Sequence, residues 1–212
     1  MKLAIMGNSI ISVDAMVKYL LSKNSNPKID ISVKEFCQLY IDLGLLEGVR
    51  GDIAFAQSCE ETGHFKFGGM VTPDMHNYGG LGATDGSPKG TGGRFPDART
   101  GILAQIQHLK AYASTEDLNK YDIMVDQRFN LVTRGIAPYV EDLVGRWATN
   151  PSYAKNIYDI YNELAKTKVE PVIEPVKPII KPIEPIKPVV ITTPYKKIVS
   201  NVRKYFKNIF IG

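Results

Sequence analysis

The chain has 212 residues, of which 44% are hydrophobic and 23% are charged, and its formal net charge is +4. This composition is that of a globular protein and excludes a fibrous or fully disordered chain. The length allows one substantial core with a short appendage. No segment approaches the roughly 18 consecutive apolar residues that a membrane-spanning helix needs.

The charge is distributed unevenly along the chain. Residues 167–212 hold nine Lys or Arg and three Asp or Glu, whereas residues 1–166 hold 17 and 19. A nucleic-acid-binding domain normally has a basic face of its own, so the near-neutral body predicts no nucleic-acid partner. We expect the protein to be a monomer.

Cysteine and histidine spacing argues against metal chemistry. Cys37 and Cys59 lack CxxC spacing, and His64, His76 and His108 lack the HExxH pattern. We therefore expect two buried free thiols, no metal site and no cofactor.

Two helices are predicted in the first quarter of the chain. Ser12 is a suitable N-cap for the helical apolar spacing of residues 13–21. Ser32 and Glu35 form a capping box that starts a second helix, and Gly44 is expected to end it.

A third helix, at about residues 47–62, places Gln57 and Glu61 on one face and ends at Gly63. Residues 63–96 are so rich in glycine that regular helix is excluded over most of the segment. We expect either a long loop or a small β-lobe there. A stretch of this length inside a compact domain is usually functional.

Helix returns after Asp97, and Asn150 with Pro151 predicts the start of a last helix. The globular domain is therefore expected to span residues 1–166, with a mainly α fold that becomes α+β if the glycine-rich segment forms a β-lobe. Residues 167–194 hold seven of the chain's 13 prolines, which favours an extended linker. Residues 195–212 have the pattern of a basic amphipathic helix.

Glu61 is the main candidate for chemistry. A carboxyl group in the last turn of a helix lies in the negative potential of the helix C-terminus, and partial burial adds to the cost of ionising it. Both effects raise the pKa, so that such a group can donate a proton near neutral pH, for example to a glycosidic oxygen. The ordinary alternative is a solvated surface glutamate.

Four segments carry a resemblance to a known family. Residues 57–63 read QSCEETG, residues 77–82 read NYGGLG, residues 94–109 run from RFPD to QIQHL, and residues 147–154 read WATNPSYA. In this order, and over roughly residues 45–165, they are similar to the motifs of the glucosaminidase domain of glycoside hydrolase family 73. That family includes bacterial autolysins and phage muralytic enzymes, and the first segment resembles its QxxxE[ST]G motif.

The resemblance implies a lysozyme-like fold and an endo-β-N-acetylglucosaminidase that cleaves the peptidoglycan glycan strand after N-acetylglucosamine, with Glu61 as the general acid. The second catalytic group stays open. Asp85 matches the position of a base in the glycine-rich lobe, although Asp85 and Gly86 are also a turn dipeptide. A substrate-assisted route would instead use the acetamido group of the sugar, oriented by Tyr153.

Four further residues are candidates for substrate binding. Gln57 shares the face of Glu61, Asn77 and Tyr78 belong to the NYGGLG segment, and Phe65 has an aromatic ring suited to stacking on a sugar. Each also has a structural explanation, as a polar helix residue, as turn-forming residues and as an aromatic plug, respectively.

Two other functions stay open: an amidase that cuts the peptidoglycan stem peptide, and a non-catalytic wall-binding module. An amidase generally needs a zinc cluster or a Cys/His pair, which the spacing does not offer. Gly7 interrupts the apolar residues 1–6, so no signal peptide is expected. We expect an endolysin or autolysin made in the cytoplasm and released to the wall by a holin or by lysis, with its basic tail on an anionic wall polymer or membrane surface.

Overall fold

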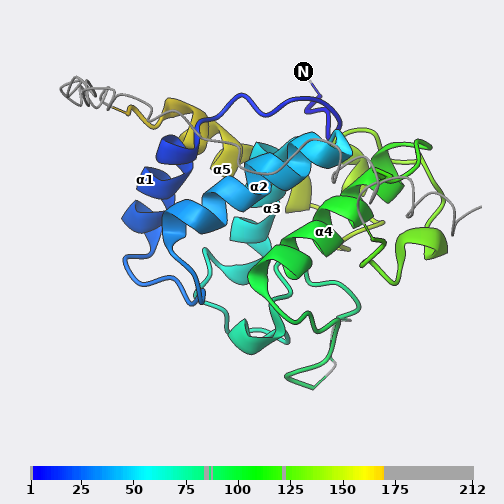
Figure 1. Ribbon diagram of the computed structural model, residues 1–212, viewed down its shortest axis with the longest axis horizontal. Helices are drawn as coiled ribbons and strands as arrows, with labels where there is room; N and C mark the ends of the chain where they lie inside the picture. Colours follow the sequence, from blue (N-terminus) through cyan, green and yellow to red (C-terminus); the bar gives the residue numbers. More distant parts are fainter. Residues whose placement is uncertain (1, 84–85, 87, 121–122, 170–212) are drawn as a thin grey trace, which may run out of the picture. The chain divides into compact units, whose positions relative to one another are not determined.

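The computed structural model describes residues 2–83, 86, 88–120 and 123–169. Over these residues the chain forms five α-helices (Figure 1): α1 (Val13–Lys23), α2 (Val33–Glu47), α3 (Gly51–Thr62), α4 (Ala98–Ala113) and α5 (Tyr153–Lys166). Three short 3-10 helices lie at Pro73–Met75, Phe129–Leu131 and Val140–Leu143. Isolated β-bridges occur in this part of the chain, but no sheet. The prediction of a mainly α fold is confirmed.

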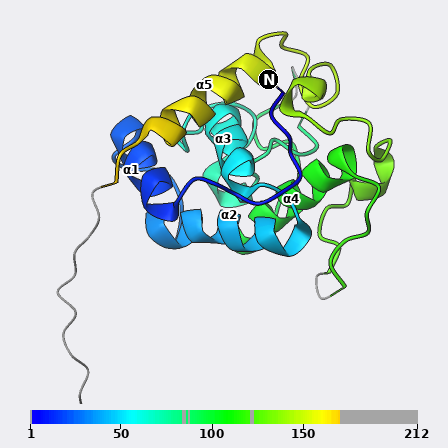
Figure 2. The same cartoon turned by 90° about the horizontal axis from the view of Figure 1, so that it is seen from above.

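Helix α3 lies at the centre of the helical body. It packs against α2, α4 and α5, and Figure 2 shows it enclosed between α5 and α2. Every residue from Gly51 to Cys59 is buried. A helix that is buried on all sides is a core helix, so its sequence reads as small and apolar residues with few charges. Only its last turn, with Glu60 and Glu61, is partly exposed.

Glycines allow α2 and α3 to cross at very short range. A Cβ atom on Gly51 would lie 2.0 Å from the carbonyl oxygen of Tyr40, and one on Gly44 would lie 2.7 Å from the nitrogen of Gly51. The prediction that Gly44 ends the second helix is therefore wrong. Helix α2 continues to Glu47, and Gly48, with a left-handed φ of +72°, caps it.

Three of the five helix starts follow the capping rules, whereas the N-caps of α3 and α5 make no side-chain cap hydrogen bond. Ser12 accepts a hydrogen bond from the nitrogen of Ala15, Ser32 from that of Glu35, and Asp97 from that of Thr100. The last helix begins two residues later than expected, with Ser152 as its N-cap in place of Asn150.

The glycine-rich segment is a loop and contains no strand among its described residues, so the prediction of a β-lobe is wrong for this part of the chain. Its glycines at 68, 80, 82, 86, 90 and 92 all have positive φ. Each such residue turns the backbone away from the extended conformation that a strand requires. The described part of the segment therefore forms successive turns and one 3-10 helix.

Cys37 and Cys59 are free and buried, as predicted. Over the described residues, no group of three or more His, Cys, Asp or Glu could hold a metal ion. In the same part of the chain, no helix is long and apolar enough to cross a membrane. The described residues end at residue 169, so most of the predicted linker (167–194) and all of the predicted basic segment (195–212) lie outside them.

Replacing Gly51 by alanine is expected to lower the free energy of unfolding by about 1–3 kcal/mol, because the new methyl group would overlap the backbone of α2. The measurement is urea-induced unfolding. Gly69→Ala is the matched control, since a Cβ at residue 69 meets nothing within 4 Å. Equal midpoints for the two variants would contradict the close crossing of α2 and α3.

Candidate functional site

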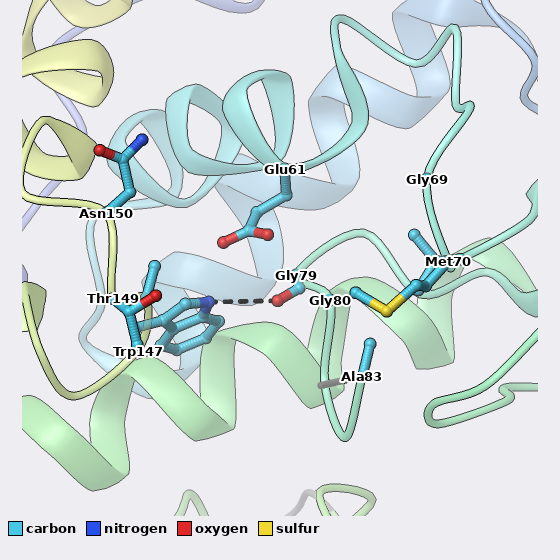
Figure 3. Close-up of a pocket in the computed structure, with 11 residues that line it drawn as sticks. Glu61, Gly69, Met70, Gly79, Gly80, Ala83, Trp147, Thr149 and Asn150 are labelled. Atoms are coloured by element: carbon cyan, nitrogen blue, oxygen red, sulfur yellow. Dashed lines mark hydrogen bonds between the residues drawn. The ribbon is translucent and has the colours of Figure 1, made fainter. Parts of the chain in front are cut away.

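A cleft of about 390 Å³ opens at the end of α3 (Figure 3). Its walls are Glu61, residues 69–71, Gly79, Gly80, Ala83 and residues 147–150. Figure 3 shows the carboxyl group of Glu61 pointing into the space between the 147–150 segment and the turn at Gly79 and Gly80. Among the described residues that line the cleft, Glu61 is the one with an ionisable side chain.

The pKa of the Glu61 carboxyl group is raised so far that about half of these groups still carry their proton at neutral pH. Burial raises the pKa of Glu61 to about 7, and polar contacts with Tyr153 and Trp147 oppose this shift only in part. The negative charge of the neighbouring Glu60 adds a small increase. A carboxyl group with this pKa can act as a general acid at physiological pH.

The structure brings Glu61, Tyr153 and Gln57 together, whereas the sequence predicted only that Gln57 shares the face of Glu61. The hydroxyl of Tyr153 donates a hydrogen bond to Oε1 of Glu61. Nε2 of Gln57 donates to the same hydroxyl at 2.9 Å. Burial and the nearby Glu61 raise the pKa of Tyr153 well above its usual range, so the phenol keeps its proton. Neither Tyr153 nor Gln57 lines the cleft; they form the support behind Glu61.

Gly80 brings the backbone directly over the acid. Its φ is +66°, and a Cβ atom there would lie 3.0 Å from Oε2 of Glu61. The preceding residue, Gly79, is equally confined, because a Cβ on it would lie 2.9 Å from Gln105 and 3.2 Å from Trp147. The two adjacent glycines thus leave room for the acid, its support and the ring of Trp147.

Trp147 is a cleft residue that the sequence analysis did not select. Its indole Nε1 donates to the carbonyl oxygen of Gly79 at 3.2 Å, which joins the two walls of the cleft. Its ring packs against His108 with a centroid separation of 5.0 Å, and His108 is paired with Asp126 at 2.7 Å. As the single tryptophan of the chain, within the WATNPSYA segment, it could have been chosen from the sequence.

Like Gln57, the three other predicted substrate-binding residues lie in the interior instead of on the cleft wall. Phe65 packs edge-on against Phe36 within an aromatic cluster that also contains Tyr78. Asn77 donates through Nδ2 to the carbonyl oxygen of Leu81 at 2.9 Å and accepts from the nitrogen of the same residue. All three side chains are at most 1% exposed. They shape the loop that forms the cleft and do not reach a ligand in it.

The predicted second catalytic group, Asp85, lies outside the described residues, so its place relative to Glu61 is not assigned. The other two carboxylates near the glycine-rich segment have structural partners. Asp74 pairs with Arg94 at 2.6 Å, which lowers the pKa of Asp74 to about 2, and Asp97 caps α4. Neither lines the cleft.

Fold and site together define a helical protein with a cleft built around one partly buried carboxyl group with a raised pKa. The chain is 44% identical over 153 residues to a protein of Borreliella burgdorferi (strain B31) described as an uncharacterized protein, and the match spans 72% of each chain. The chain therefore belongs to the same family as this Borreliella protein. No family model matches the chain, and no solved structure matches it.

The raised pKa of Glu61 has a consequence for stability. The folded protein binds the proton more tightly than the unfolded chain, in which the group titrates near 4.5. The stabilisation is therefore fully present below about pH 4.5 and is lost as the pH rises through about 7.

Glu61→Gln mimics the neutral acid and should escape this loss. We expect similar free energies of unfolding for wild type and variant at pH 4, and a variant more stable by at most about 3 kcal/mol at pH 8. Urea unfolding at several pH values measures the gap. A gap that is the same at both pH values would contradict the raised pKa.

Proposed function

We propose that the protein is a glycoside hydrolase that cleaves the glycan strand of bacterial peptidoglycan after N-acetylglucosamine, with Glu61 as general acid. The observation that carries the proposal is the carboxyl group of Glu61, which lines a cleft, has a pKa of about 7 and is held by Tyr153. The four sequence segments that resemble the glucosaminidase domain support it, because three of them, at residues 57–63, 77–82 and 147–154, supply cleft walls.

In the proposed reaction, the acidic proton of Glu61 passes to the glycosidic oxygen as the bond between this oxygen and the anomeric carbon breaks. A water molecule loses a proton to the base and bonds to the anomeric carbon. The carboxylate left behind keeps the hydrogen bond from Tyr153, which favours the charged form. Glu61 thus loses its proton to a group that carries developing negative charge, and Tyr153 offsets part of the cost. We also propose that the helical body and the loop on the two sides of the cleft are arranged as in lysozyme.

The hydrogen bonds of Tyr153 bear on the second catalytic group. The hydroxyl hydrogen of Tyr153 is committed to Glu61, so it is not available to the carbonyl of a sugar acetamido group. We therefore assign Tyr153 to the support of the acid and keep Asp85 as the candidate base that activates water. The basic end of the chain, residues 195–212, is proposed to hold the enzyme on an anionic wall polymer or membrane surface.

Purified cell walls should be cleared by the wild-type protein in a zymogram and not by Glu61→Gln. The variant is expected to lose at least about 100-fold in rate, the lower range of what a general acid contributes. Circular dichroism of the variant checks that the fold persists. The rate of the wild type should also fall as the pH rises above about 7, because Glu61 then loses its proton.

Mass spectrometry of the digested wall separates the proposal from its alternatives. New reducing ends on N-acetylglucosamine support the glucosaminidase. Free stem peptides with an intact glycan strand would establish an amidase instead. Binding of walls with no product from wild type or variant would establish a non-catalytic wall-binding module.

Gly80→Ala should lower the rate by about 10-fold or more, because the new methyl group would lie against Oε2 of Glu61 and obstruct proton transfer. Gly145→Ala is the matched control. It carries the same backbone strain, with a φ of +77°, but its Cβ would meet nothing within 4 Å. Rates per folded molecule should separate the two variants, and equal rates would remove Gly80 from the active site.

A further inference from the structure

Behind Glu61, a chain of three buried side chains runs from the backbone of α3 to the acid. We infer that Gln105 and Gln57 are positioning residues that act through Tyr153 to hold the acidic proton of Glu61 on Oε2, the oxygen beside Gly80. The inference rests on the proposed role of Glu61 as general acid. It assigns a purpose to Gln105, whose side chain is fully buried and lies outside the cleft.

The direction of the chain is set by a backbone carbonyl. The amide group of Gln105 has one atom 3.0 Å from the carbonyl oxygen of Ala54. A carbonyl oxygen only accepts hydrogen bonds, so this atom is the nitrogen Nε2. The other amide atom then is the oxygen, which accepts from the hydroxyl of Ser58 at 2.7 Å. The opposite orientation would place two acceptors face to face in the core, which costs free energy.

The orientation of Gln105 fixes that of Gln57. Nε2 of Gln105 is also 2.8 Å from the amide group of Gln57 and donates to it, so the facing atom of Gln57 is its oxygen. The nitrogen of Gln57 consequently faces the hydroxyl of Tyr153 at 2.9 Å and donates to it. Gln57 is only 1% exposed, so water does not compete for these bonds.

Tyr153 passes this direction on to the acid. Because its oxygen receives a hydrogen from Gln57, its own hydrogen must point elsewhere, and it points to Oε1 of Glu61. Oε1 is therefore an acceptor, and because a carbonyl oxygen accepts better than a hydroxyl oxygen, this bond favours the proton of a neutral Glu61 on Oε2. A Cβ on Gly80 would lie 3.0 Å from Oε2, so the proton is held at the side of the turn that lines the cleft.

No proton moves along this chain of hydrogen bonds during the reaction. Glu61 gives up the hydrogen on Oε2 to the glycosidic oxygen, the glycosidic bond breaks, and the carboxylate keeps its contact with Tyr153 through Oε1. The chain saves Glu61 a rearrangement, because the acid would otherwise have to move its proton from the oxygen facing the interior.

The direction is tested by the pKa of Glu61, measured by carboxyl-carbon NMR in the full-length protein. A Tyr153 that donates to Glu61 favours the carboxylate, so Tyr153→Phe should raise the measured pKa of Glu61. A Tyr153 that accepts from Glu61 favours the neutral acid, and the same variant would then lower it. A fall would overturn the inference, and so would an unchanged value.

Gln105→Met tests the remote part of the chain. It removes the group that orients Gln57, so the pKa of Glu61 should shift in the same direction as in Tyr153→Phe, by a smaller amount. Gln107→Met is the matched control, because Gln107 is also buried in α4 but bonds the segment at residues 123–126. A shift in both variants, or in neither, would remove Gln105 from the chain.

Neutron diffraction at about pH 5 gives a direct check that requires no substitution. A deuteron on Oε2 of Glu61 and a Tyr153 hydroxyl directed at Oε1 are expected, and a deuteron on Oε1 would overturn the inference. These measurements do not use enzymatic activity. A proton on Oε2 combined with an active Glu61→Gln variant would therefore refute the proposed function alone. A proton on Oε1 combined with an inactive Glu61→Gln variant would refute only the role of the glutamines.

Discussion

A carboxyl group that is withdrawn from water must either stay neutral or find compensating donors, and the whole site is organised around this constraint at Glu61. The group lies at the end of a helix whose other turns are completely buried, so the packing of α3 against α2, α4 and α5 also fixes the position of the acid. The polar support behind it comes from elements far apart in the chain: Gln57 on α3, Gln105 on α4 and Tyr153 at the start of α5. The contacts that hold the helical core together therefore also fix the position of the acid.

Much of the helical body could be predicted because its signals are local. Ser12, Ser32 and Asp97 cap helices through bonds to residues three positions ahead, and a helix period places Gln57 beside Glu61 whatever the rest of the chain does. Gly44 could not be read correctly in this way. Gly44 allows the close crossing of α2 and α3 and does not end α2. This role depends on a partner helix that local sequence does not reveal.

The cleft was predicted less well, because it depends on which face of a loop meets the core. Phe65 and Tyr78 have the ring chemistry of sugar-binding residues, but in this loop their rings complete an aromatic cluster with Phe36. Trp147, which lines the cleft, lies in a segment without regular secondary structure, where periodicity gives no orientation. Glycine content likewise predicted irregular backbone but could not separate a β-lobe from a loop; the left-handed φ values at residues such as Gly80 and Gly82 make that distinction.

The balance at Glu61 explains why the support is polar. An apolar environment alone would raise the pKa of Glu61 further and leave a carboxylate without donors after proton transfer, whereas a full set of donors would keep the group ionised and useless as an acid. The phenol hydroxyl of Tyr153, itself kept protonated by burial, and the polar contact with Trp147 give an intermediate result, with the pKa of Glu61 at about 7. The protein accepts a loss of stability above this pH, and the group that causes the loss is the one group in the described cleft able to donate a proton. A carboxyl group that lowers the stability of the fold and lines a cleft supports the proposed role of Glu61 as an acid.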